Sequence, residues 1–196
     1  MVALANPIPY GLRDVKLIPY LTPAAIAFGT VLTDLPNSQV FEFNDTEDYD
    51  DLRGDDQLVT SHGQGSQVAW TLGNGGISFA AMAVLAGGTI TTSGTTPNGL
   101  TFLRKLVTDI RPFFTAIGQA ISDSGGDFHA AVWLCRSTGN IEGKLEDTNF
   151  YIPGASGTGY PCRIPTGSVA GAPITGAVYD LIQHETALAI VAPVAA

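Results

Sequence analysis

The sequence contains few charged residues and few cysteines. Only 14% of its 196 residues are Asp, Glu, Lys or Arg, against about 25% in an average soluble domain. Its two cysteines cannot form a disulfide framework. Glycine and proline, with 23 and 12 residues, are abundant instead, a composition that disfavours helical bundles and suits short strands joined by turns. Basic residues are scarce, and the net charge of −9 argues against a surface that grips nucleic-acid phosphates.

Long, uninterrupted apolar runs are missing as well. Residues 17–33 are uncharged, but prolines and polar residues interrupt them, and no basic start precedes an apolar run as in a signal peptide. The apolar run 77–86 is too short for a bilayer, which needs about 20 residues. We therefore expect neither a signal peptide nor a membrane span, and we expect folding in the cytoplasm of the cell that makes the protein, with Cys135 and Cys162 as reduced thiols.

The low charge also bears on association. Large, weakly charged surfaces usually mark areas that a partner covers. The chain carries 18 acidic and 9 basic residues in 196 positions. This favours a subunit of an assembly, and a weakly charged secreted domain is the alternative.

The pattern predicts a mainly β fold, a β-sandwich or barrel-like domain with one flanking helix, formed by residues 1–196 as a single unit. Alternating Val68, Trp70 and Leu72 predict a half-buried strand. The alanine-rich run 77–86 predicts the helix, with Gly87 as a left-handed cap. Residues 1–12 are expected to be an extended arm and 186–196 a C-terminal tail. Further strands are expected at 15–18, 39–43, 100–107, 110–117, 128–136, 149–152 and 177–184, and a loop or turn at 89–99, 123–126, 154–157 and 167–173.

One segment holds most of the acidity. Residues 42–56 contain eight acidic residues and a single base, Arg53, so this segment has a net charge of −7 and the rest of the chain −2. We expect residues 44–57 to form a long acidic loop. An EF-hand pattern fails there, because Tyr49 and Arg53 fall on ligand positions. A solvated loop and a looser cation site stay open, but we favour contacts with basic groups on a neighbouring subunit. The candidate contact residues are Glu47, Asp48, Asp50, Asp51, Arg53, Asp55 and Asp56.

Catalytic patterns are absent from the sequence. Residues 123–126, Asp-Ser-Gly-Gly, resemble the turn around a trypsin-like nucleophile, but Ser122 replaces the preceding glycine, and a hairpin turn explains them better. His62, His129 and His184 are too dispersed for a recognisable metal pattern. We expect no enzyme activity, no cofactor and no metal.

Several short segments, in their order along the chain, resemble the major tail protein, or tail tube subunit, of long non-contractile-tailed bacteriophages, particularly those that infect actinobacteria. The resemblance covers roughly residues 11–145, and it rests on the segments 11–16, 34–37, 52–56, 75–78, 88–94 and 121–127 together with Phe41.

That resemblance implies a sandwich-like subunit with a flanking helix that assembles into six-membered rings, which stack into a hollow tube. DNA passes through the tube without specific binding. Implied partners are other copies of the chain and the tape-measure, tail-terminator and distal tail proteins. The implied location is the virion tail. The alternative is another β-sandwich module, such as a capsid-decoration or carbohydrate-binding protein. Trp70 and Trp133 are expected in the core, whereas sugar-binding modules usually display aromatic residues.

Overall fold

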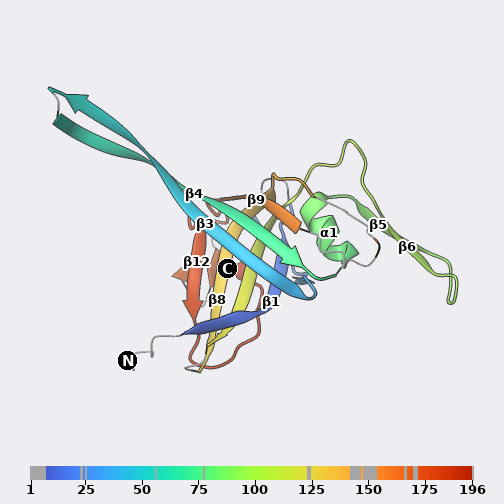
Figure 1. Cartoon of the computed structure of the whole chain (residues 1–196). Coiled ribbons are helices and arrows are strands. Elements are labelled where there is room, and N and C mark those ends of the chain that lie inside the picture. Colours follow the sequence, from blue (N-terminus) through green and yellow to red (C-terminus); the bar gives the residue numbers. More distant parts are fainter. Residues whose placement is uncertain are drawn as a thin grey trace.

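The structure is a computed structural model that describes residues 8–22, 24, 26–55, 57–76, 78–122, 125–141, 147, 154–165, 167–169 and 172–195. Within these ranges the chain is mainly β with one helix, as predicted (Figure 1). The described strands outside the main sheet are β5 (Thr89–Ser93) paired with β6 (Leu100–Arg104), and β10 (Gly167–Val169) paired with both β11 (Ala172–Pro173) and β13 (Val194–Ala195).

The main sheet is antiparallel throughout, and it branches at strand β8. The C-terminal half of β8 pairs with β9, and its N-terminal half pairs with β12. The order across the sheet is β2 (Thr33–Asp34), β1 (Pro9–Pro19), β7 (Phe113–Ser122), β8 (Asp127–Ser137), β9 (Gly154–Tyr160), β4 (Gln57–Asn74) and β3 (Ser38–Gly54), with β12 (Tyr179–Gln183) on β8.

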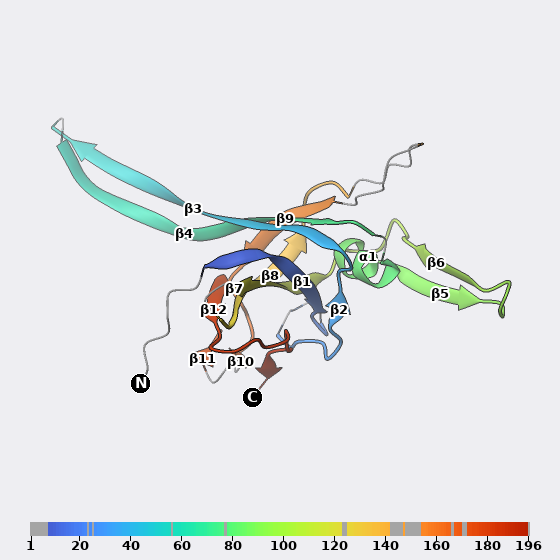
Figure 2. The ribbon, with the colours of Figure 1, turned by 60° about the horizontal axis from the view of Figure 1, so that its bottom comes forward.

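The sheet folds over itself and encloses the first core. Figure 2 shows the layer of β3, β4 and β9 above the layer of β1, β7 and β8. Val68, Trp70 and Leu72 are buried on the inner face of β4, which confirms the alternation read from the sequence. Phe41 of β3 packs against this core beside Gly118 of β7, where any larger side chain would collide with its ring.

A second core lies on the other face of β7 and β8. Trp133 and Leu134 both belong to it, although they are consecutive. The cause is a register shift opposite Phe114 and Ala116, where β8 carries one extra residue and the bulge turns two neighbours to the same side. Ile164 and Ile174, from the segments around β10 and β11, cover this face. The protein therefore has three layers around two apolar cores.

The helix α1 (Phe79–Ala86) confirms the predicted helix in type and in its C-terminal end. Ser78 caps its start by accepting a hydrogen bond from the Ala81 N–H at 3.3 Å, and Ile77 lies outside the described residues. Gly87 follows with the positive φ expected of the cap, 76°, but its ψ of 175° differs from that of a left-handed helical cap. Most of the helix is covered, since Ala81, Val84, Leu85 and Ala86 are buried, while Phe79 at its start stays 40% exposed.

Three loop predictions were wrong. The acidic segment 44–57 is not a loop, because its described residues continue β3 and begin β4. Residues 89–99 begin with β5 and join it to β6 as a second hairpin. Residues 154–157 form the start of β9, since glycine there lets the strand pack closely on Trp70 and on the Arg136 carbonyl.

The remaining boundaries shift by a few residues. The predicted arm 1–12 joins β1 from Pro9, and β7 starts at Phe113. Within the region predicted as turn, residues 167–169 and 172–173 are short strands, and β13 lies in the predicted tail. Residues 123 and 124 and the strand expected at 149–152 lie outside the described residues. Gly125 and Gly126 have φ of 88° and 78°, as in a tight hairpin turn.

Candidate assembly interface

The most conspicuous feature of the molecule is a hairpin that projects from its body (Figure 1). The outer parts of β3 and β4, residues 45–55 and 57–67, extend well beyond both cores, and we call them the arm. Ten residues of extended strand span about 33 Å. Every side chain of the arm whose burial is described is exposed, apart from the half-buried Gly63. The arm therefore gains nothing from either core of its own chain.

The structure places the predicted contact residues together on this arm. Glu47, Asp48, Asp50, Asp51 and Arg53 lie on β3, Asp55 lies in the turn at the tip with φ 50°, and Asp56 lies outside the described residues.

Successive side chains of a strand alternate between its faces. Glu47 and Asp51 therefore share the face that carries Phe43 nearer the body, while Asp48 and Asp50 lie on the opposite face. Both faces of the arm are acidic.

Few contacts hold these side chains. The Tyr49 hydroxyl donates a hydrogen bond of 2.7 Å to Glu47 Oε2, and this bond to a carboxylate raises the pKa of Tyr49. Arg53 Nη2 lies 3.8 Å from Asp51 Oδ2, an ion pair within the arm. An ion pair this exposed contributes little to stability. The acidic side chains of the arm are exposed to solvent, so a charged partner can reach them.

The arm carries exposed apolar side chains beside its acids, and these could not have been located from the charge pattern. Tyr49, Leu52, Leu58 and Val59 are all more than half exposed, at 62%, 60%, 56% and 62%. Acidic and apolar surface alternate along one narrow ribbon, a combination that suits a protein partner better than bulk water.

The second hairpin, β5–β6, also projects from the body (Figure 2). Each residue of β5 is exposed, including Ile90, and Leu100 at the start of β6 is exposed too. Thr92 and Thr101 face each other across the two strands at 3.3 Å.

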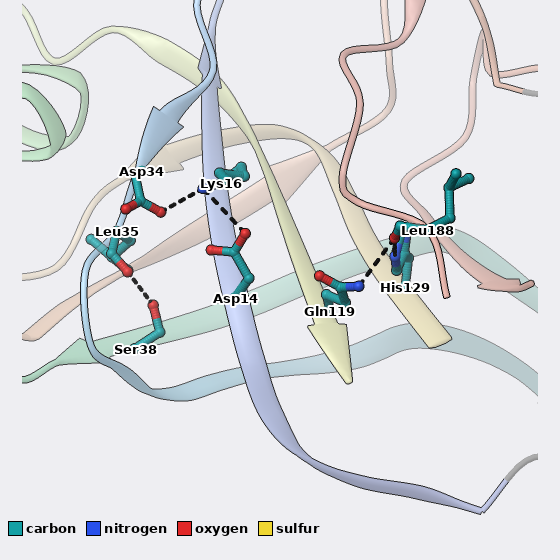
Figure 3. A network of polar contacts seen from close by, with 8 residues as sticks. All are labelled: Asp14, Lys16, Asp34, Leu35, Ser38, Gln119, His129 and Leu188. Atoms are coloured by element: carbon teal, nitrogen blue, oxygen red, sulfur yellow. Dashed lines mark hydrogen bonds and ion pairs between the residues drawn. The ribbon is translucent and has the colours of Figure 1, made fainter. Parts of the chain in front are cut away.

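A polar cluster that the sequence did not reveal lies at the opposite end of the sheet from α1. Figure 3 shows Gln119 and His129 directed at the Leu188 carbonyl, at 3.0 and 3.1 Å. Asp127 is 1% exposed, and its Oδ2 accepts hydrogen bonds from Gln119 Nε2 at 2.6 Å and the Leu188 N–H at 2.8 Å. Its Oδ1 has no hydrogen-bond partner among the described residues. The cluster fastens the segment around Leu188 to the sheet.

His129 and His184, which are far apart in the sequence, are neighbours in the structure. His184 Nε2 lies 3.2 Å from His129 Nδ1, although 55 residues separate them. Burial lowers the pKa of His129, and the adjacent His184 lowers it further. Among the described residues no group of three or more His, Cys, Asp or Glu could hold a metal ion. His129 Nε2 also contacts the Leu188 carbonyl at 3.1 Å, so the pair lies where the C-terminal segment packs on the sheet.

A second polar network fixes β1 beside β2. Lys16 Nζ lies 2.7 Å from Asp34 Oδ1 and 3.1 Å from Asp14 Oδ2, and the Ser38 hydroxyl donates to the Leu35 carbonyl at 2.6 Å (Figure 3). These contacts fix the turn from which β3 starts, and so the direction in which the arm leaves the body.

Trp70 and Trp133 lie in the cores, as predicted. Cys135 and Cys162 are buried and not joined by a disulfide bond, and burial raises the pKa of both thiols. None of the helices in the described ranges is long and apolar enough to cross a membrane. No model of a known protein family and no curated protein matches the chain.

Proposed function

We propose that this chain is a structural subunit that assembles with copies of itself, and that the assembly is the tail tube of a long-tailed bacteriophage. The observation that carries the proposal is the arm, a two-stranded ribbon with exposed acidic and apolar side chains and no core beneath it. An isolated two-stranded hairpin is marginally stable in water. A long arm of this kind is expected where another subunit covers it.

The open sheet edges support the same proposal. Strand β3 forms one edge of the main sheet along its whole length, and at the other edge β2 covers only residues 16 and 17 of β1. Exposed strand edges invite pairing with other chains, and closing subunits into a ring removes them. Contacts of two different kinds, one within a ring and one between rings, produce a tube.

The order of segments that resembles tail tube subunits supports the specific identity. Stacked six-membered rings, a channel for DNA, and the tape-measure, tail-terminator and distal tail proteins as partners belong to this proposal, as does the virion tail as location. A net charge of −9 fits a channel that lets DNA slide without binding its phosphates. The proposed role needs no catalytic residue, cofactor or metal.

The deciding experiment is negative-stain microscopy of the purified chain at increasing concentration, which is expected to show rings or tubes. A matched variant replaces residues 48–65 with Asn-Gly, a turn that keeps the pairing of Glu47 with Ser66. Deleting 47–56 alone would remove one strand and leave its partner unpaired. The shortened variant is expected to fold but not to form tubes. A strictly monomeric intact chain, or binding to capsids alone, would contradict the proposal.

A further inference from the structure

Positive charge, scarce elsewhere, gathers around one phenylalanine on the body. The guanidinium carbons of Arg136 and Arg163 lie 5.1 and 5.8 Å from the centre of the Phe113 ring. Arg111 joins them beside Phe113 and Arg136, along the wall of a hollow of about 420 Å³. We call Arg111, Phe113, Arg136 and Arg163 with this hollow the arginine site. It holds three of the nine basic residues of the chain.

The contacts described for the three arginines hold them in place, and none of these contacts is with a carboxylate. Arg111 Nη1 donates hydrogen bonds to the carbonyls of Ser137 at 3.0 Å and Gly139 at 2.6 Å. Arg136 and Arg163 stack over Phe113, a cation–π arrangement. None of the three forms a salt bridge with any carboxylate in the part of the chain that the structure describes. Like charges this close repel, so an acidic ligand would be bound favourably.

The hollow is apolar as well as basic. Leu21 and Ile110 line it and are 66% and 75% exposed. The arm presents the matching surface, with acids on both faces and exposed Tyr49 and Leu52 between them. Arginine suits such a site, because its planar fork binds a carboxylate through two hydrogen bonds.

The arm of the same chain does not supply these acids. Its two strands pair along their length down to Gly54 and Gln57, and both views show it leaving the body rather than folding back (Figures 1 and 2). The acidic segment also accounts for −7 of the net −9, so no other part of the chain offers comparable negative charge. A second copy of the chain is the partner that fits in both charge and shape.

We propose that the arm of one copy docks on the arginine site of another, with arm carboxylates between Arg136 and Arg163. This inference rests on the proposed function, since it names the surface that receives the arm within the assembly. Charge complementarity of this kind mainly selects the correct partner and the register of the contact. It explains why an acidic protein gathers three arginines at one place where the described residues supply no carboxylate partner.

A charge exchange tests the proposal. The arm variant is Asp48→Lys with Asp51→Lys, and the site variant is Arg136→Glu with Arg163→Glu. Each is expected to lower the apparent association constant at least about tenfold in sedimentation velocity. Mixing the two variants is expected to restore association, because each then meets an oppositely charged surface on the other. One chain that carries all four changes is expected to associate with itself.

Two controls keep the result specific. Arg13→Glu with Arg104→Glu makes the same change in net charge on other exposed residues and is expected to associate normally. Arg163→Glu alone changes one exposed side chain, and circular dichroism checks that it folds. Loss of association in the Arg13 and Arg104 control, or normal association of the site variant, would overturn the proposal.

The outcomes separate this inference from the proposed function. If the variants still form tubes, the docking proposal is wrong and the proposed tail tube function is unaffected. If association follows the charge exchange but microscopy shows neither rings nor tubes, the tail tube function is wrong and the docking proposal is supported. A chain that never associates overturns both. A short DNA duplex that binds the intact chain but not the site variant, with association unchanged, assigns the arginine site to nucleic acid instead.

Discussion

The two halves of the β3–β4 hairpin use the same backbone pairing for opposite purposes. Near the body, Phe43 and Trp70 face each other across the strands and pack in the core. Farther out, Tyr49 lies opposite Gly63 and packs against no core residue. Hydrogen bonds between strands are present in both halves, so they do not distinguish them. What differs is the apolar area that each half buries within its own chain, which is large near the body and absent in the arm.

The largest expected change in stability comes from a substitution in the part of the hairpin near the body. Trp70→Ala is expected to lower the free energy of unfolding by about 3–5 kcal/mol, because it empties the centre of the first core. Tyr49→Ala in the arm is expected to change it by no more than about 0.5 kcal/mol. Urea denaturation of both monomeric variants measures the difference. Equal losses would show that the arm is part of the folding unit.

Two glycines of β9 allow a matched comparison between a closely packed position and an open one. A methyl group on Gly157 would collide with the Arg136 carbonyl and the Trp70 ring, while one on Gly154 would meet only the Leu72 carbonyl, at 3.8 Å. Gly157→Ala is therefore expected to cost about 1–3 kcal/mol. Gly154→Ala is the control and is expected to stay within about 0.5 kcal/mol. Similar values in thermal unfolding would mean that β9 does not pack closely on β4.

These glycines show why part of the fold could be predicted and part could not. Val68, Trp70 and Leu72 reveal their strand through local alternation, and Gly87 reveals the end of the helix through its backbone freedom. Residues 154–157 look like a turn because their need for glycine comes from Trp70, which is distant in the sequence. The segment 44–57 looks like a loop because charge marks exposure, and exposure does not exclude a strand whose partner follows it.

The candidate interface was predictable to the same extent. The acidic residues from Glu47 to Asp55 could be identified because they lie close together in the sequence. The arginine site could not be, since Arg111, Arg136 and Arg163 are 25 or more positions apart. The pairing of β7 with β8 brings Arg136 opposite Phe113, and Arg163 reaches the same ring because it follows β9, which also pairs with β8. His129 and His184 meet for the same reason, through the pairing of β12 with β8. The resemblance to tail tube subunits stays a prediction.

A smaller change in stability is expected when the pH is lowered, and it arises at His129 in the body of the protein. Burial and then His184 lower the pKa of His129, so the folded state binds fewer protons there than the unfolded state. Its contribution to stability is complete above pH 6.5, the ordinary histidine value, and is lost as the pH falls toward its folded pKa. His184 and the carboxylate of Asp127 are the titratable groups that face it.

His129→Gln is expected to flatten this acid-side loss, measured as the midpoint of thermal unfolding between about pH 7.5 and pH 5.5, the window around the ordinary histidine pKa. His62→Gln, on the exposed arm, is the control and is expected to keep the slope of the unchanged chain. An unchanged slope in His129→Gln would assign the acid sensitivity to other groups.

The smallest expected changes in stability have opposite signs in the body and in the arm. On the body, Lys16 is paired with Asp14 and Asp34, so Lys16→Gln is expected to destabilise the monomer by about 0.5–1 kcal/mol. In the arm, Asp48 is one of several excess negative charges, so Asp48→Asn relieves repulsion and is expected to leave stability unchanged or raise it by up to about 0.5 kcal/mol. Adding about 0.5 M salt is expected to shrink both differences, because both sites are partly exposed. A loss of stability in Asp48→Asn of the size seen in Lys16→Gln would mean that the carboxylate of Asp48 already has a partner within its own chain, and the arm would then have no need of a second copy.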